Sequence, residues 1–405
     1  MTTPQTRVKL SVLLFLEFLI WGSWYVPMGT YIAKALNSAD QIGSAYATNA
    51  IAAIVSPFFV GMFADKFFPA QRVLGVLHLL GAAVLYYLTT VSDFGGFYWG
   101  ILVYNMLFMP TLALSNSVAF GQLANPEKDF GSIRVLGTIG WIISGYLLDL
   151  FGVAGTANLF LIGAVGSVVL GVYSFFLPNT PPKGKGQSTT FAQIIGLDAL
   201  SMFRDRSFAI FFLSSLLICI PLTFYYNLTN LYLTDTGMQN VSSNMSWGQV
   251  SEIAFMLLLP VFLARLGIKN ILIIAILAWV SRYLLFAYGG QNTIMLFTGI
   301  LLHGICYDFF FVTGQIYTDQ KAGPRYKNSA QGMITLATYG VGMFIGSLIQ
   351  NAVFKAYTVN EVTQWTTVWL IPAGIAVAVL IVFVLLFNDR KRVETPVEEP
   401  VLGPV

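Results

Sequence analysis

The chain has 405 residues, of which 56% are hydrophobic and only 10% are charged. Soluble proteins carry about 25% charged residues, so this composition excludes a soluble globular protein. The net charge is +3, and the two cysteines, Cys219 and Cys306, lie within apolar stretches, which argues against a disulfide framework or a metal centre. We expect an all-α protein embedded in the lipid bilayer, with no cofactor and no metal.

Twelve apolar stretches follow one another along the chain, each long enough to cross a membrane as a helix. We place them near residues 8–33, 42–63, 71–91, 97–123, 132–151, 154–177, 208–233, 246–264, 268–288, 292–317, 328–350 and 364–387. The polar stretch between the sixth and the seventh contains Pro181 and Pro182 and is typical of a linker. The sequence therefore predicts two six-helix halves: an N-terminal half (1–178), a cytoplasmic linker (179–206), a C-terminal half (207–388) and a cytoplasmic tail (389–405).

Lys and Arg are divided very unequally between the two sides of the predicted membrane. Seventeen of the 21 fall in segments on one side, whereas only Lys34 and Lys355 fall on the other. The remaining two, Arg134 and Arg282, lie within predicted spans. Because these residues concentrate in cytoplasmic loops, both termini are predicted to be cytoplasmic.

Ionisable side chains within spans are the first candidates for a functional site, because each costs about 2.5–3.5 kcal/mol or more to insert. Asp308 lies near the middle of the tenth span, where a carboxyl group could exchange a proton, recognise a hydroxyl or pair with a buried arginine. His303 and Tyr307 share a helical face beside it. Glu17 in the first span stays unassigned, and His78 in the third is expected to pack in the interior.

Two further groups of polar residues lie on single helical faces. Gln249 and Glu252 are three residues apart on the eighth span; together they suit a sugar or a base, or else join two helices. Arg134, Thr138 and Trp141 form one stripe on the fifth span. A guanidinium, a hydroxyl and an aromatic plane suit a heterocycle that carries a sugar, although Arg134 could instead extend to the lipid headgroups.

The seventh and ninth spans add weaker candidates. Pro221 can loosen the seventh helix, and Thr223 and Tyr226, which follow it, are candidates for contact with a substrate. Tyr is also typical of interfacial belts, which is the alternative interpretation. Arg282 lies close to the predicted outer end of the ninth span, so we expect a snorkelling or structural charge.

Eight short motifs spread over nearly the whole chain resemble those of one family. They are EFLIWGSW at 17–24, GMFADK at 61–66, MPTL at 109–112, IRVLGTIG at 133–140, GLDA at 196–199, RLGIKN at 265–270, YDFF at 307–310 and SAQGM at 329–333. The order and spacing of these motifs resemble those of the nucleoside:proton symporters of the major facilitator superfamily. This resemblance implies the major facilitator fold and a bacterial cytoplasmic (inner) membrane. The resemblance implies alternating access to a nucleoside held between the halves, driven by a proton gradient. It also implies that the substrate site includes Arg134, Thr138, Gln249, Glu252 and Asp308.

The sequence therefore predicts proton-coupled nucleoside uptake. We expect Glu252 and Asp308 to hold the ribose, Trp141 or Tyr226 to stack on the base, and Asp308, or alternatively Glu252, to carry the proton. A proton-coupled transporter of sugars or other small polar solutes, a membrane enzyme and a receptor without turnover remain alternatives. The enzyme is disfavoured, because the sequence has neither a long extramembrane segment nor a metal-ligand or nucleophile motif.

The short loop before the third span carries Asp65, Lys66 and Arg72. These charges could form a conformational latch that holds the inward-closed state, or simply anchor the loop on the positive side of the membrane. The expected partners are a nucleoside, a proton and the lipid bilayer. We expect no nucleic acid partner and a monomeric protein.

Overall fold

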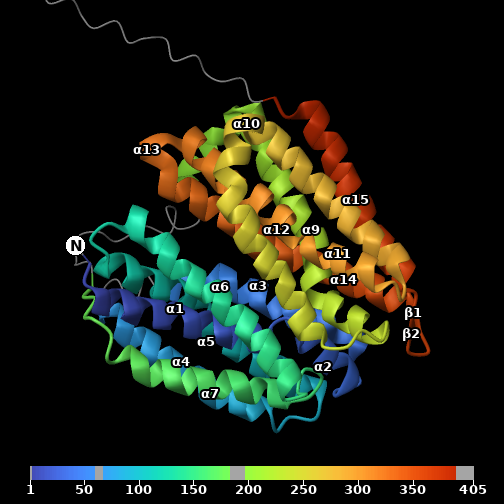
Figure 1. The fold of residues 1–405 in the computed structure, drawn as a ribbon, viewed down its shortest axis with the longest axis horizontal. Coiled ribbons are helices and arrows are strands. Elements are labelled where there is room, and N and C mark those ends of the chain that lie inside the picture. The colour runs from blue at the N-terminus through green and yellow to red at the C-terminus, as the bar shows by residue number, and fades with distance from the viewer. Residues whose placement is uncertain (1, 60–66, 183–196, 389–405) are drawn as a thin grey trace, which may run out of the picture.

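The structure is a computed structural model and describes residues 2–59, 67–182 and 197–388. Its helices form two bundles that meet at one end and diverge at the other (Figure 1). The first bundle contains α1 (Pro4–Trp24), α2 (Met28–Lys34), α3 (Ile42–Phe59), α4 (Ala70–Leu88), α5 (Phe94–Gln122), α6 (Pro126–Leu150) and α7 (Asn158–Ser174), with a 3-10 turn, η1 (Ala39–Gln41), before α3.

The second bundle follows the predicted linker. It contains the 3-10 segment η3 (Leu197–Arg204), α9 (Arg206–Asp235), α10 (Val241–Gly289), α11 (Thr293–Leu301), α12 (His303–Tyr307), the π-helical segment η4 (Asp308–Val312), α13 (Thr313–Thr335), a second π-helical segment η5 (Leu336–Gly342), α14 (Met343–Ala356) and α15 (Trp365–Leu386). A small hairpin of β1 (Thr358–Val359) and β2 (Val362–Thr363) joins α14 to α15. The predicted latch residues Asp65 and Lys66, most of the linker and the tail from residue 389 lie outside the described residues.

Several helices begin at a side chain that caps them. Asp93 accepts a hydrogen bond from the backbone N–H of Gly96 at the start of α5, and Asp205 accepts from Ser207 and Phe208 at the start of α9. Such caps satisfy N–H groups that have no partner within the helix. Within α10, Gly267 has a positive φ of 70°, so one helix ends there and another begins.

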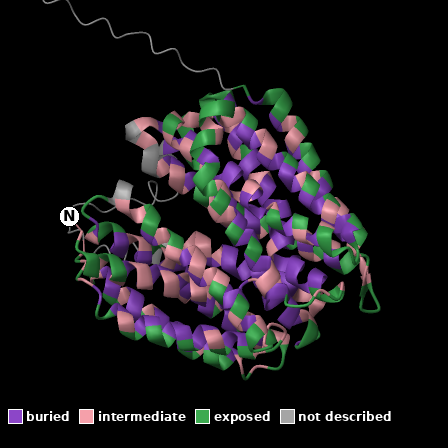
Figure 2. Ribbon diagram, in the orientation of Figure 1, coloured by how far each residue is buried: buried purple, intermediate pink, exposed green. Residues whose placement is uncertain are grey.

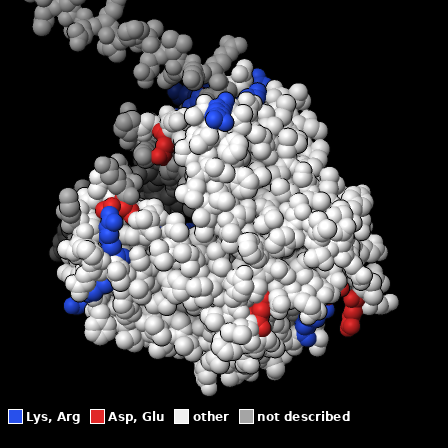
Figure 3. Space-filling model, viewed as in Figure 1, with Lys and Arg blue, Asp and Glu red and all other residues white. Residues whose placement is uncertain are grey.

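The described residues include nine helices that are long and apolar enough to cross a membrane. Buried residues run along the interior of each bundle (Figure 2), whereas large apolar side chains such as Leu257, Ile294 and Leu385 are exposed. Figure 3 shows Lys, Arg, Asp and Glu near two opposite ends of the molecule, with a broad surface of other residues between them. An apolar belt between two charged ends is the surface expected of a multi-pass membrane protein.

The bundles hold together at one end through polar contacts. Thr30 of α2 donates to Asn230 of α9 at 2.6 Å, and the Nζ of Lys34 lies 2.6 Å from a carboxylate oxygen of Asp235. Ser243 of α10 donates its backbone N–H to Asp149 of α6. At the opposite end the surface is hollowed between the bundles (Figure 3). The structure is therefore closed at one end and open at the other.

The first span is not a continuous helix. It breaks at residues 25–27 between α1 and α2, where the Tyr46 hydroxyl donates to the Tyr25 carbonyl and accepts from the N–H of Gly29. α1 packs against α6 and α7 of its own bundle, whereas α2 packs against α9 of the other. Backbone groups freed by a break within a membrane need such partners.

Candidate functional site

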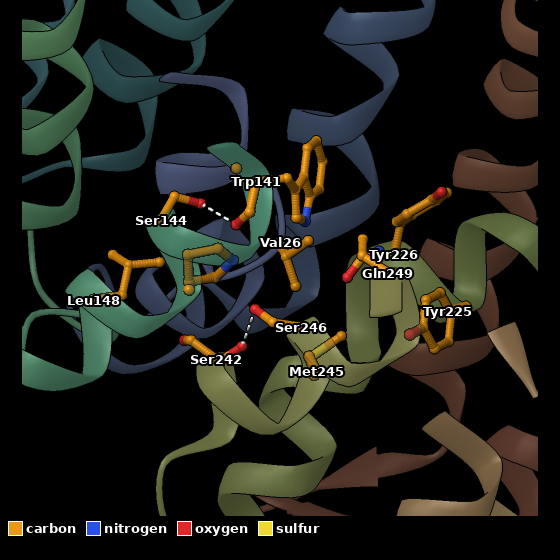
Figure 4. A pocket seen from close by; sticks show the side chains of 13 residues that line it. Val26, Trp141, Ser144, Leu148, Tyr225, Tyr226, Ser242, Met245, Ser246 and Gln249 are labelled. Carbon is orange, nitrogen blue, oxygen red and sulfur yellow. Dashed lines mark hydrogen bonds between the residues drawn. The ribbon is translucent and has the colours of Figure 1, made fainter. Parts of the chain in front are cut away.

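A small cavity lies between the two bundles, next to the end where they meet. Its walls come from α1 and the turn after it, from α6, and from α9 and α10. Trp141 and Ser144 of α6 face Tyr226 and Gln249 of the other bundle across Val26 (Figure 4). The structure thus brings three of the predicted substrate residues, Trp141, Tyr226 and Gln249, to one place.

Aromatic rings continue this wall from one bundle to the other. The Trp141 ring lies 5.4 Å from the ring of Trp21 and 6.4 Å from that of Tyr25, centroid to centroid. The Tyr25 ring lies 5.6 Å from that of Tyr226. Tyr25 therefore links the two residues predicted to stack on a base. The sequence analysis missed Trp21 and Tyr25, although their i, i+4 spacing on one helical face could have indicated them.

Glu252 and His303 are held side by side by a close contact between α10 and α12. A side chain at Gly304 would lie 2.5 Å from the carbonyl oxygen of Ser251, so only glycine allows this approach. Ser251 also donates its hydroxyl to the Leu301 carbonyl at 2.5 Å. The Nε2 of His303 then lies 3.8 Å from a carboxylate oxygen of Glu252, which is too far for a direct hydrogen bond.

Asp308 is completely buried at the start of η4. Neither of its carboxylate oxygens has a hydrogen-bond partner within the described part of the chain. An ionised carboxylate in such a place is costly, and binding a proton removes the charge. Beside it, the hydroxyls of Tyr307 and Tyr339 share a hydrogen bond that joins the two π-helical regions. Segments of π-helix frequently occur at functional sites.

Arg134 extends the group of charges to the first bundle. Its guanidinium carbon lies 4.0 Å from the centre of the Phe18 ring, and Arg134 interacts electrostatically with Glu252 of the other bundle. Glu252 in turn interacts with Asp308. Thr138, one turn after Arg134, is partly exposed. One cation and two carboxyl groups from both bundles can therefore attract a polar solute and hold a proton.

Two predicted residues lie away from this group. Thr223 is completely buried, donates its hydroxyl to the Ile220 carbonyl and packs against Gly346 of α14. It is not among the residues that line the cavity. Arg72 is exposed near the start of α4. The structure does not bring Thr223 to the candidate site, and the role of Arg72 in a latch, which lies apart from that site, stays a prediction.

A second carboxylate and histidine lie inside the first bundle. The Nε2 of His78 is 3.0 Å from one carboxylate oxygen of Glu17, and Thr111 donates to the other at 2.6 Å. All three residues are buried. His78 is thus an interior residue, as predicted, and Glu17, which the sequence left unassigned, is its hydrogen-bond partner.

Arg282 requires a correction. A snorkelling side chain would reach the membrane surface, but Arg282 is 0% exposed, because it lies under the rings of Tyr225 and Trp279. The snorkelling interpretation is therefore wrong. The alternative, a structural charge, is compatible with its position.

Comparison with known proteins decides the family. A family model described as nucleoside H+ symporter matches residues 4–392. The chain belongs to the nucleoside H+ symporter family. It is 42% identical to YegT of Escherichia coli (strain K12), a protein named as a candidate nucleoside transporter, over 97% of this chain and 96% of YegT. It is 33% identical to the nucleoside permease NupG of Escherichia coli (strain K12), over 96% of this chain and 97% of NupG.

The fold leads to the same family. The crystal structure of NupG matches with a TM-score of 0.87 at 33% identity and covers 95% of this chain and 100% of that chain. The predicted transporter architecture is confirmed at the level of the fold. Because the relatives are transporters and permeases, the membrane-enzyme alternative is set aside. The protein is a multi-pass membrane transporter for nucleosides and protons.

Proposed function

We propose that the nucleoside binds in the cavity between the bundles and that a proton bound at Asp308 drives its uptake. The observation that carries this proposal is the burial of Asp308 without a hydrogen-bond partner among the described residues, in a group that includes Glu252 and Arg134. A carboxyl group that lacks a hydrogen-bond partner among the described residues can gain one from substrate hydroxyls or bind a proton. Glu252 is the alternative proton carrier.

Each part of a nucleoside has a counterpart in this group. The base stacks on Trp141 or Tyr226, because both rings line the cavity, and it hydrogen-bonds to Gln249 or Arg134. The ribose hydroxyls bind Glu252 and Asp308. Thr138, His303 and Tyr307 complete the proposed site, whereas the orientation of Thr223 gives it no support.

The transport cycle follows from the closed and open ends. The open end carries the N-terminus, and Arg7 and Arg72 belong to the predicted cytoplasmic segments (Figure 1). We therefore assign the structure to a state open to the cytoplasm. Alternating access would close this end and separate the contacts between α2 and α9. Asp65, Lys66 and Arg72 are proposed to latch the closed cytoplasmic end.

Twelve spans account for the described helices. The two parts of α10 on either side of Gly267, together with α3 and α7, bring the nine long apolar helices to this number. We propose the halves 1–178 and 207–388, the linker 179–206 and the tail 389–405, with both termini in the cytoplasm and the protein in the bacterial inner membrane. One chain supplies both walls of the cavity, which supports a monomer as the working unit.

The test is uptake of radiolabelled uridine and adenosine into proteoliposomes, with and without an inward proton gradient. We expect gradient-driven accumulation by the unmodified protein, which an excess of free sugar does not inhibit. We expect the Asp308→Asn variant to lose accumulation but to retain exchange of nucleoside across the membrane, because its side chain cannot release a proton. Absence of nucleoside uptake by correctly folded protein would contradict the substrate assignment. If Asp308→Asn still accumulates nucleoside in a proton gradient, Glu252 is the proton carrier instead.

A further inference from the structure

Arg282, in the part of α10 after Gly267, is a buried cation that the proposed transport site does not use. Its Nε donates to the Gly299 carbonyl at 3.1 Å. Its Nη1 and Nη2 make no geometrically satisfactory hydrogen bond to any residue that the structure describes, although the Tyr283 hydroxyl lies nearby. A cation buried within a membrane is costly and usually marks a functional region.

The guanidinium of Arg282 reaches the site through one aromatic ring. Its central carbon lies 4.1 Å from the centre of the Tyr225 ring. The His303 ring stacks on Tyr225 at 5.1 Å with an angle of 19° between the planes. The guanidinium and the imidazole are therefore separated by no more than these two distances combined, within an interior of low polarity. The next ring along, Tyr307, stacks on His303 at 5.7 Å.

Among the described residues, Arg282 is the permanent positive charge that acts on His303. The titratable and charged groups that face it are Tyr225 and Tyr226 of α9, Glu252 and Arg282 of α10, Cys306 and Tyr307 of its own helix, and Asp308 of η4; α11 supplies none. Its Nδ1 is buried without a hydrogen-bond partner in the described ranges. Burial of the imidazole disfavours its charged form, and a positive charge nearby disfavours it further, so Arg282 adds to the opposition to protonation.

We propose that Arg282 is a positioning residue that keeps His303 uncharged, so that the proton taken up during transport binds to a carboxyl group of the site. An imidazolium 3.8 Å from Glu252 would hold that carboxylate in its ionised form and would compete for the proton. With Arg282 in place, His303 contributes a neutral ring to the aromatic stack, and Glu252 and Asp308 stay free to titrate. This inference rests on the proposed proton site at these two carboxyl groups.

The first experiment measures nucleoside uptake in proteoliposomes as a function of pH for Arg282→Met. Without the guanidinium, His303 can bind a proton, which stabilises the ionised carboxylates. We expect the midpoint of the uptake profile to move to lower pH by about one unit. Arg282→Lys keeps the positive charge and should keep the midpoint of the unmodified protein. In a His303→Asn background, Arg282→Met should produce no shift to lower pH.

The second experiment observes the histidine directly and needs no Arg282 variant that folds. The chain has only two histidines, so magnetic resonance of the ¹⁵N-histidine protein in lipid bilayers gives two imidazole signals, and His303→Asn identifies one of them. We expect the His303 imidazole to stay neutral at pH 5.5, below the ordinary histidine value of about 6.5. A His303 imidazolium at that pH would overturn the proposal.

Failure of this inference can be told apart from failure of the proposed function. If the unmodified protein does not accumulate nucleoside in a proton gradient, the proposed function fails. If it does, but folded Arg282→Met keeps the original midpoint, or if the shift persists without His303, only the role of Arg282 is contradicted. A purely structural Arg282 would lower the yield of folded protein and leave the pH profile unchanged.

Discussion

Each bundle of this transporter places one carboxylate beside one buried histidine, and the two pairs differ in how fully they are hydrogen-bonded. In the first bundle, His78 and Thr111 satisfy both carboxylate oxygens of Glu17. In the second, Glu252 and His303 are 3.8 Å apart, and the other imidazole nitrogen has no partner in the part of the chain that the structure describes. The same two residue types can therefore hold helices together in one place and remain available to a substrate in another.

We expect the largest loss of stability when Glu17 is replaced. Glu17→Leu leaves His78 and Thr111 buried without their acceptor, and loss of one partner from a buried pair costs about 3–5 kcal/mol. We expect a large fall in the unfolding temperature in detergent. Glu252→Leu should abolish transport with a much smaller fall in the unfolding temperature, because Glu252 has no such hydrogen bond to a described residue. Equal loss of stability in the two variants would contradict the distinction.

A milder change tests the contact that joins the two bundles. A methyl group at Gly145 of α6 would lie 2.2 Å from the Ser246 hydroxyl and 2.7 Å from the Ser242 carbonyl of α10. Gly145→Ala should therefore destabilise the closed end by about 1–3 kcal/mol. We expect a thiol introduced nearby to react faster with an impermeant reagent added from outside.

The matched control for this experiment lies on the same helix. Gly131→Ala adds a methyl group where no atom lies within 4 Å, so it should not change the rate of labelling. If both variants leave the rate unchanged, the contact at Gly145 does not hold the outer end closed.

The smallest expected effect belongs to an exposed ion pair. Desolvation of the Asp205 carboxylate alone would raise its pKa, but hydrogen bonds from Lys321 and from the N–H groups of Phe208 and Ser207 outweigh this, so its pKa is lowered. A carboxyl whose pKa is lowered by folding stabilises the folded protein at any pH above its pKa in the unfolded chain. This stabilisation is lost as the pH falls through its pKa in the folded protein.

The measurement is the unfolding temperature of Asp205→Asn in detergent across the acidic range. The pair is partly exposed, so the loss should be about 0–1 kcal/mol at neutral pH. It should fade as the pH falls below about 4 and through the lowered pKa of Asp205 in the folded protein. A difference that grows as the pH falls would contradict this sign.

Many residues of the candidate site could be predicted from the sequence, but few of the residues that surround it could. Polar residues within apolar spans are conspicuous, so Gln249, Glu252 and Asp308 could be chosen from their positions. Tyr25 was missed, because an aromatic residue in a membrane helix usually contacts lipid or a neighbouring helix, and only its spacing from Trp21 set it apart. The pairing of Glu17 with His78 joins residues 61 positions apart, and no local pattern records such a contact.

The burial of Arg282 was missed for a related reason. Its place along the span indicated a short distance to the membrane surface, but the direction of a side chain depends on which helices surround it. α9 covers this face of α10 with Tyr225, and that packing is decided by the whole bundle. Apolar content alone fixes the length of a span and not its neighbours.

The break between α1 and α2 divides the molecule differently from its linker. Along the chain, both helices belong to the first half, yet α2 is bonded to α9 through Thr30 and Lys34. When the bundles swing apart at that end, either these bonds rupture or α2 travels with the opposite bundle and the chain bends at residues 25–27. In the second case the boundary between the two moving bodies runs through the first span. The Tyr46 hydroxyl, which bonds to the backbone on both sides of residues 25–27, then lies at the point where the chain bends.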